Sequence, residues 1–492
     1  MGIPSFYKRL IQTIKGIVTP LQLEGRPTIL GFDANCAIYD CVASLSKRIP
    51  YTKDIQIMWE AELIQTTILY FETVIKNVNP SEGVWIAFDG VAPLAKIRQQ
   101  RGRRFKSISS EDRWDTNAIT PGTVFMNNLA KAFHAWGKKS KLPIYVSAAD
   151  EPGEGEQKLM ERLRAYPTSH MIVYGLDADL IILALLHLPY AKIQLYREDV
   201  AFGKKSTEKQ FLYLSIGILA KELEAKWKLT MDEFAACVNL LGNDFIPHGL
   251  GLKIREEGME RVLEAYQHVK MSNPPIVKGF EYCASTLKAL LEELSKEESK
   301  WVLEIAVEKL TTRPGQYCSS SDPVERAKAE ENDLPVVWAA EKALLDSTLN
   351  LRSNYKDIYQ KVGLWDASYE NVSKKYLEAL AWCFAYYKGI QVDTEWYYPW
   401  WVAPPLDTIV VPASLEIPLT KRVPLKPTDQ LAMVLPIRSY SLLPAVYQSF
   451  PNDHPELFPV EWSLFSLGRR FLWECEPMIP LVLPTTIKKW KG

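Results

Sequence analysis

Short apolar runs alternate with longer amphipathic segments over the first 270 residues. The runs are rich in β-branched and aromatic residues, and they cover 27–33, 83–89, 142–147, 171–175 and 192–196. Segments such as 59–77 and 122–136 lie between them and repeat apolar residues at helical spacing. Strands that alternate with helices predict an α/β fold with a mainly parallel central sheet. The nearly continuous apolar strands indicate that helices flank both of its faces.

The pattern changes twice after this region. Residues 271–365 are helical and rich in charge, with a loop predicted at 318–335. Farther on the aromatic content rises, and prolines recur from Pro399 to Pro484. Because proline interrupts helices, we expect extended segments laid over the globular body there. The predicted parts are a core at 1–270, a helical connector at 271–365 and a C-terminal region at 366–492.

Composition narrows the class of protein. The 492 residues are 47% hydrophobic and 24% charged, which excludes wholesale disorder. A formal net charge of −1 argues against coating nucleic acid by bulk positive charge but leaves room for a local basic site. No apolar run reaches the ~18 residues that span a bilayer, so we expect no membrane contact. The seven cysteines are scattered without a CxxC pair, which indicates reduced thiols.

Acidic side chains follow the predicted strands and two further segments. Ligand sites in open parallel sheets form at the carboxyl ends of the strands, so acids at those ends converge on one edge. Two more acids stand at the entrance of the helix that follows Pro152, and another follows Gly242. The full set is Asp33, Asp89, Glu154, Glu156, Asp177, Asp179 and Asp244.

Each of these acids alone is explained equally well as a helix cap or a turn residue. Together, the seven carboxylates would repel one another unless counter-ions lay between them. Mg²⁺ and Mn²⁺ prefer hard oxygen ligands, and a pair of such ions drives in-line cleavage of phosphodiesters. The set therefore predicts a site for two Mg²⁺ or Mn²⁺ ions.

Residues 89–106 predict a helix with an unrelieved run of basic side chains. One face of this helix carries Lys96, Gln100, Arg103 and Arg104. A solvated face usually mixes charges of both signs, whereas no acid lies in this run. Since Arg and Lys bind phosphate strongly, the face predicts an anion site beside the metal acids.

These motifs resemble those of the Xrn-type 5′→3′ exoribonucleases. The similarity extends over nearly the whole chain, and its most specific blocks are DGVAP with KIRQQRGRRF, PGEGE, YGLDADLI and LGNDFIPH. Other matching segments are MGIPSFYKRL, FDANCAIYDC, ITPGTVFM, LYREDVAFG, IREEGMERVLEAY, YYKGIQVDTEWYYPWWVAP, LKPTDQLAMVLP and LFPVEWSLFSLGRRFLWECEPMIPLV. We expect a compact member that lacks the long C-terminal extension of the large ones.

The resemblance implies a role for each site residue. It assigns the seven acids to metal binding and catalysis, places Asn35 beside the first of them, and gives the basic helix face the substrate's 5′-monophosphate. Tyr39 stands where the family usually has a histidine that stacks on the terminal nucleotide, and Trp396 is expected to supply the opposing ring. Leu94 stands where the family commonly has a basic residue, and Gln157 stands where it usually has a histidine.

The resemblance also implies the architecture and the activity. The core becomes a PIN/flap-nuclease-like first homologous region, and 366–492 becomes a second homologous region that completes the active-site wall. The implied enzyme is a metal-dependent hydrolase that processively degrades 5′-monophosphorylated single-stranded RNA to mononucleotides in RNA and mRNA decay. We expect a cytoplasmic monomer. A nuclear location, a viral source and protein partners such as decapping factors stay open.

Two other functions stay open on the sequence alone. A structure-specific flap-type DNA endo/exonuclease shares this distribution of acids, and 248–253 resembles the glycine-rich hairpin that such enzymes use on duplex DNA. A non-catalytic RNA-binding protein derived from a nuclease would be expected to have lost acids, and all seven are present here.

Overall fold

A seven-stranded sheet forms the centre of the computed structural model, which describes residues 5–20, 22, 25–107, 113–198 and 211–491. The strands are β1 (Val18–Thr19), β2 (Ile29–Asp33), β3 (Gly83–Ala87), β4 (Ile144–Ser147), β5 (His170–Tyr174), β6 (Lys192–Glu198) and β7 (Phe211–Ser215). Their order across the sheet is β1-β7-β6-β5-β2-β3-β4. The strands β2 to β6 are parallel, which confirms the predicted α/β class. The antiparallel strands β7 and β1, which extend the sheet beyond β6, were not predicted.

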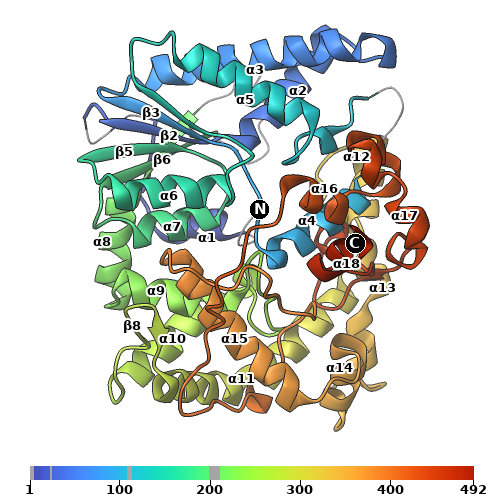
Figure 1. Ribbon diagram of the computed structural model, residues 1–492. Helices are drawn as coiled ribbons and strands as arrows, with labels where there is room; N and C mark the ends of the chain where they lie inside the picture. The colour runs from blue at the N-terminus through green and yellow to red at the C-terminus, as the bar shows by residue number, and fades with distance from the viewer. Residues whose placement is uncertain (1–4, 21, 23–24, 108–112, 199–210, 492) are drawn as a thin grey trace.

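Helices cover both faces of the sheet, as the apolar strands indicate (Figure 1). One face carries α2 (Asn35–Arg48), α3 (Gln56–Val78) and α5 (Val124–Gly137). The other carries α1 (Phe6–Thr13), α6 (Gly155–Ala165), α7 (Asp179–Leu186) and α8 (Ile216–Trp227). Within β2, Leu30 and Phe32 join the first apolar layer, while Ile29 joins the second. The alternation of side chains along the strand thus fills two separate cores.

The middle of the chain is helical beneath this core (Figure 1). Its elements are α9 (Met231–Val238), α10 (Gly258–Lys270), β8 (Val277–Lys278), β9 (Glu281–Tyr282), α11 (Ala284–Thr311), α12 (Pro323–Asn332), α13 (Leu334–Trp338), α14 (Tyr355–Leu364) and α15 (Tyr369–Tyr387). The loop predicted at 318–335 is wrong, because α12 and the start of α13 occupy most of it. The Asp322 side chain accepts from the Val324 N–H at 2.9 Å, and Pro323 occupies the first turn.

From Pro399 onward the C-terminal region is mostly extended, as its prolines predict. Its regular elements are α16 (Pro427–Val434), α17 (Phe450–Asp453), α18 (Pro484–Lys491), β10 (Leu464–Phe465) and β11 (Glu476–Pro477). None of these helices exceeds 8 residues. The largest apolar cluster includes Leu180, Leu290 and Trp382, so the three regions share one core.

Helix α4 (Leu94–Lys106) joins the sheet domain to the C-terminal region. Its apolar residues Ile97 and Phe105 pack in a third cluster with Met433 and Phe458. Arg101 is 1% exposed and donates to the backbone carbonyls of Met433, Pro480 and Leu457. Some basic residues of this helix, such as Arg101, therefore hold the fold together and do not form an anion-binding surface.

Two neighbouring cations on α4 have the same kind of partner. Arg98 donates to the carbonyls of Tyr398, Trp400 and Pro399 and stacks 3.4 Å from the centre of the Trp401 ring. The ammonium of Lys106 donates to two carbonyls of the segment 473–475. These contacts fix extended C-terminal backbone that has no sheet partner to satisfy it.

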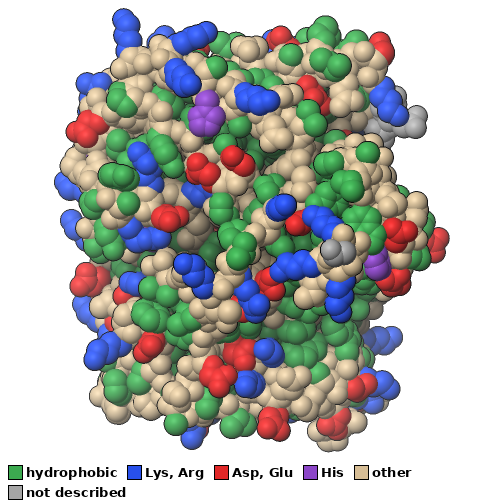
Figure 2. All heavy atoms as spheres, viewed as in Figure 1, with side chains coloured by type: hydrophobic (Ala, Val, Ile, Leu, Met, Phe, Trp, Pro, Cys, Tyr) green, Lys and Arg blue, Asp and Glu red, His purple; other side chains and the backbone are tan. Residues whose placement is uncertain are grey.

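The surface and the thiols agree with the composition. Figure 2 shows basic and acidic side chains interspersed over one face, without a broad patch of one sign. The seven cysteines form no disulfide bonds with one another. None of the helices in the described part of the chain is long and apolar enough to cross a bilayer.

We predict that Arg101→Met destabilises the protein by about 3 kcal/mol, because three buried carbonyls lose their donor. The measurement is the free energy of unfolding in urea. Arg103→Met is the matched control, since the exposed Arg103 lies on the same helix and should change stability by less than about 0.5 kcal/mol. Equal losses in both variants would contradict the structural role of Arg101.

Candidate active site

Three carboxylates meet at the carboxyl edge of the sheet. Asp33 ends β2, Asp89 follows β3, and Glu156 lies in the first turn of α6. One carboxylate oxygen from each lies within 4.8 Å of the others. Gly155 makes this approach feasible, because a Cβ there would lie 2.6 Å from Asp33 Oδ1 and 2.9 Å from the Ala87 carbonyl oxygen.

The hydrogen-bond donors to the Asp89 carboxylate in this trio are neutral. The Asn35 amide Nδ2 donates to Asp89 Oδ2 at 3.0 Å, and the Asp89 N–H donates to Asn35 Oδ1 at 3.2 Å. The Gly155 N–H donates to Asp89 Oδ1 at 2.8 Å. Asn35 therefore fixes the orientation of Asp89, which fits its predicted place beside the first acid.

Burial and mutual repulsion disfavour ionisation of Asp33 and Glu156. Burial raises the pKa of Asp33 well above its ordinary value, and the charges of Asp89, Asp177 and Asp179 raise it further. Burial also raises the pKa of Glu156, with Glu154 and Asp33 adding to the effect. Three converging carboxylates, two of which are buried and resist ionisation without a counter-ion, fit a hard divalent cation.

The other four acids lie around this trio. Glu154 is the N-cap residue of α6, Asp179 begins α7, Asp177 lies in the loop after β5, and Asp244 follows the short 3-10 helix Asn239–Leu241. Asp179 is 1% exposed, and its Oδ1 has no hydrogen-bond partner among the described residues. Burial raises the pKa of Asp179 to about 7 despite the nearby positive charge of Lys96. The fold thus brings the seven predicted acids close enough for their charges to influence one another.

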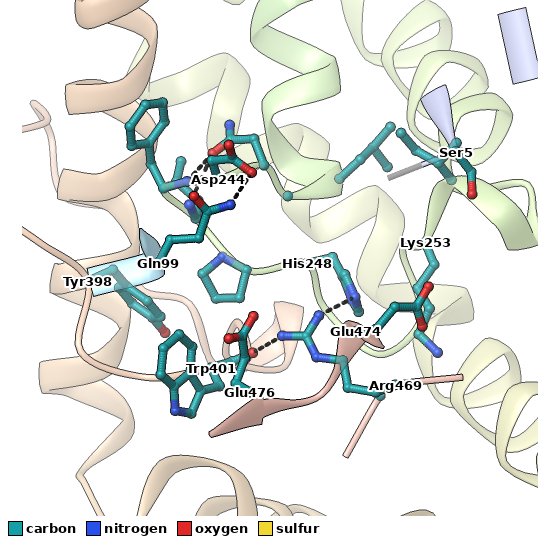
Figure 3. Close-up of a pocket in the computed structure, with 18 of the residues that line it drawn as sticks. Ser5, Gln99, Asp244, His248, Lys253, Tyr398, Trp401, Arg469, Glu474 and Glu476 are labelled. Atoms are coloured by element: carbon teal, nitrogen blue, oxygen red, sulfur yellow. Dashed lines mark hydrogen bonds between the residues drawn. The ribbon is translucent and has the colours of Figure 1, made fainter. Parts of the chain in front are cut away.

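Lys96 lies inside the acid cluster. Its ammonium is 2.5 Å from Glu154 Oε1 and 2.8 Å from Asp244 Oδ2. Burial alone would lower the pKa of Lys96, but the charges of Asp244 and Glu154 raise it well above its ordinary value. Gln99 also donates to Asp244 Oδ1, at 2.6 Å (Figure 3). The predicted helix is present, but the first cation of its predicted phosphate-binding face contacts carboxylates.

The other three residues of that face lie farther along α4. Gln100 is buried, and its Oε1 accepts from Gln430 at 3.4 Å. Arg104 donates to the Gln100 carbonyl at 3.2 Å and to Thr120 Oγ1 at 2.8 Å. The Arg104 Nε has no hydrogen-bond partner among the described residues, and Arg103 is exposed. These guanidinium groups retain donor capacity for an anion.

The two predicted stacking rings differ in exposure. Tyr39 on α2 is 45% exposed. Trp396 is 8% exposed, stacks on Trp382 at 5.5 Å between ring centres, and donates its indole N–H to Glu378 at 3.1 Å. The stacking role of Trp396 stays a prediction, and it would require the ring to be uncovered.

A cavity of about 300 Å³ lies beside α4, with Gln99 and Asp244 at one end (Figure 3). Its far wall includes Trp401 and Arg469. Arg469 donates to His248 Nε2 at 3.1 Å and to the Trp401 carbonyl at 2.9 Å. Burial and the charge of Arg469 hold the pKa of His248 well below its ordinary value, so the ring is neutral.

Sequence reasoning missed several residues of this site. Gln430, Thr120 and Arg469 contact it from distant parts of the chain, and no local motif marks them for this purpose. Tyr386 is another, since its hydroxyl donates to Glu154 Oε2 at 3.0 Å from α15.

Comparison with known proteins points to one family. The model described as the XRN 5′-3′ exonuclease N-terminus matches residues 1–112 and 107–199. The model described as the Xrn1 helical domain matches residues 353–486. Together the matched segments cover more than half of the chain and include the acids at 33–179, the whole of α4 and the α15 segment.

Curated relatives agree with these matches. The chain is 28% identical to 5′-3′ exoribonuclease 1 of Homo sapiens over 98% of its length and 33% of the relative's. It is 24% identical to 5′-3′ exoribonuclease 1 of Schizosaccharomyces pombe over 99% of its length and 48% of the relative's. It is 29% identical to 5′-3′ exoribonuclease 2 of Kluyveromyces lactis over 68% of its length and 43% of the relative's. The chain spans about a third to a half of these relatives.

A solved structure is also similar. The catalytic core of Rad2 in complex with a DNA substrate aligns with 60% of this chain and 81% of that chain, at 16% identity and a TM-score of 0.35.

We predict that Asp33→Asn stabilises the metal-free protein by about 1–2 kcal/mol at pH 8. The raised pKa means that the folded protein holds the Asp33 proton more tightly than the unfolded chain, so ionisation costs stability as the pH rises. The gain should therefore be small near pH 4 and grow toward pH 8. The measurement is urea unfolding in EDTA at several pH values.

Asp54→Asn serves as the control for this prediction, because Asp54 is exposed and far from the sheet edge. In saturating Mn²⁺ the wild type should become more stable to unfolding than the Asp33 variant, since the variant has lost a candidate ligand. A variant that is less stable than the wild type in EDTA at pH 8 would contradict the repulsion described here.

Proposed function

The chain belongs to the XRN family of 5′-3′ exonucleases, and on that premise we propose that it is a metal-dependent 5′→3′ exoribonuclease. Its substrate would be single-stranded RNA with a 5′-monophosphate, degraded processively to mononucleotides. The observation that carries the proposal is the convergence of Asp33, Asp89 and Glu156 oxygens within 4.8 Å beside the basic helix α4. We also propose that the chain acts as a monomer in the cytoplasm, on the strength of the family resemblance.

The acids are proposed to hold two divalent cations, Mg²⁺ or Mn²⁺. The trio at Asp33, Asp89 and Glu156 fits one ion, and the remaining four acids are proposed to hold the second. When bound, such ions supply Lewis-acid stabilisation of the reacting phosphate and lower the pKa of a bound water. Asn35 keeps the Asp89 carboxylate in its orientation through bonds to both its side chain and its backbone.

Helix α4 is proposed to bind the terminal phosphate. Arg104 is held by Thr120 and the Gln100 carbonyl, so its guanidinium is already ordered before substrate binds. Exposed Arg103 adds a second set of donors one residue away. Since Arg pairs well with phosphate oxygens, the two residues would place the 5′ end at a fixed distance from the acids.

Tyr39 is proposed to stack on the terminal base. Its ring is 45% exposed, and Arg104 lies within electrostatic reach of its hydroxyl. Base stacking tolerates any sequence, which suits an enzyme that removes successive nucleotides. The C-terminal segments that pack around α4 would form the wall that excludes duplex RNA.

We predict that RNA with a 5′-monophosphate is degraded at least about tenfold faster than the same RNA with a 5′-hydroxyl or a cap. Charge-assisted hydrogen bonds to the phosphate contribute about 1.5–3 kcal/mol each, and neither of the other ends offers them. The measurement is decay of the three RNAs in Mg²⁺, with flap DNA compared in parallel. Equal rates on the three ends would refute the phosphate site, and a longer first product would indicate an endonuclease.

We predict that Glu154→Ala or Asp177→Ala abolishes turnover while the circular dichroism spectrum is unchanged. Arg103→Ala should instead lower the preference for 5′-monophosphate over 5′-hydroxyl RNA by about tenfold or more, because it removes a phosphate donor and leaves the acids intact. The measurement is kcat/KM on both RNAs. Arg48→Ala, an exposed arginine on α2, is the control and should leave the preference as it is.

A further inference from the structure

The negative charges of the seven acids are unequally compensated by neighbouring cations. Asp89 accepts from two neutral donors, the Asn35 amide and the Gly155 N–H, and forms a trio with Asp33 and Glu156. On the other side of the cluster, Glu154 and Asp244 share one ammonium, that of Lys96. One part of the site therefore lacks a cation within contact distance among the described residues, while the other part already holds one.

The Lys96 bridge is buried and well supported. The side chains of Lys96, Glu154 and Asp244 are 7%, 3% and 4% exposed. Each carboxylate keeps its second oxygen bonded to a neutral donor: Tyr386 donates to Glu154 Oε2 and Gln99 to Asp244 Oδ1 (Figure 3). The two carboxylates are thus held apart at the spacing of one small cation, and an ammonium occupies that place.

A divalent cation and this ammonium cannot share the two carboxylates. Glu154 and Asp244 each contact Lys96 at 2.5–2.8 Å, so an ion bound to the same oxygens would lie against a like charge in a buried site. Lys96 must leave before the second cation binds. Its four-carbon side chain can do so, because its flexible methylenes allow the ammonium to move without moving α4.

The position of Lys96 on α4 indicates what attracts it away. Lys96 lies one turn before Gln100 and two turns before Arg103 and Arg104, on the face that is proposed to bind the terminal phosphate. A terminal phosphate carries nearly two negative charges near neutral pH, so it can compete with the carboxylates for the ammonium. The internal phosphates of RNA carry only one.

We propose that Lys96 is a resident cation that holds Glu154 and Asp244 until the 5′-phosphate of the substrate draws it away, so that end recognition opens the second metal site. This inference rests on the proposed function. By linkage, the phosphate and the second cation increase each other's affinity by the same factor. RNA with a 5′-hydroxyl leaves Lys96 in place and the second metal site closed.

The test is Mn²⁺ binding to the full chain without RNA, measured by isothermal titration calorimetry. The wild type should bind one ion tightly and a second at least about tenfold more weakly than Lys96→Met does. Lys96→Arg keeps a cation in place and should resemble the wild type. Lys309→Met is the matched control, because Lys309 is buried and paired with Glu341 away from the acids, and it should leave both affinities unchanged.

A second readout covers the case in which Lys96→Met folds poorly. Adenosine 5′-monophosphate should tighten the second Mn²⁺ site of the wild type, whereas adenosine should not. Lys96→Met, in which the site is already open, should lose that difference. The thermal midpoint of Lys96→Met should also rise more on adding Mn²⁺ to an EDTA-treated sample than the wild type does.

Two results would overturn the proposal: a second site that is no tighter in Lys96→Met than in the wild type, or a wild-type second site that ignores the nucleotide phosphate. Neither result depends on turnover. Failure of the proposed function would appear separately, as a lack of metal-dependent RNA hydrolysis by the wild type.

Discussion

Repulsion among buried carboxylates is the constraint to which the rest of the site responds. Strand β2 lies between β3 and β5 in a parallel arrangement, so their carboxyl ends bring Asp33 and Asp89 to one edge, and α7 begins with Asp179 beside them. Burial removes the water that would screen these charges, and the pKa of Asp33 rises accordingly. Neutral donors orient the carboxylates without cancelling their charge. An environment of this kind binds cations in preference to any other ligand.

Helix α4 connects this constraint to the C-terminal region. Its first turns carry Lys96 into the acids, while Arg98 and Arg101 bind the carbonyls of extended C-terminal segments. A Cβ at Gly102 would lie 3.3 Å from Pro477, so the helix packs closely against this region. The segments hold the helix in place, and the helix positions cationic groups near the carboxylates. The C-terminal region is therefore part of the active-site construction although it contributes none of the seven acids.

Local patterns in the sequence predict what is local in the fold. The five parallel strands, the acids that follow them and the cationic face of α4 are all read from adjacent or periodic residues. Strands β1 and β7 have no such local pattern, because they are defined by their pairing: β1 pairs with β7, and β7 pairs with β6. Helix α12 has no buried residue, so its sequence lacks the apolar stripe that would predict a helix. The helix depends instead on the cap at Asp322.

Partners that lie far away in sequence could not be predicted either. Lys96 was assigned to phosphate from its helical face, but Asp244, 148 residues away, determines where its ammonium lies. Backbone carbonyls, the partners of Arg98 and Arg101, leave no trace in a sequence of side chains. The burial of Trp396 depends on Trp382 and Glu378 of α15, whose packing follows from the complete fold.

Opposite charges meet in the same arrangement. Lys96 of α4 contacts Glu154 and Asp244, so the ammonium and the two carboxylates each limit what the other can bind. A ligand must offer enough negative charge to compete with carboxylates for the cations of α4. An internal phosphodiester brings one charge, whereas a terminal monophosphate brings nearly two and has an additional free oxygen. In the proposed function, this opposition of carboxylates and cations would favour a terminal monophosphate over an internal phosphodiester, so a preference for strand ends would follow from the charge balance of the site.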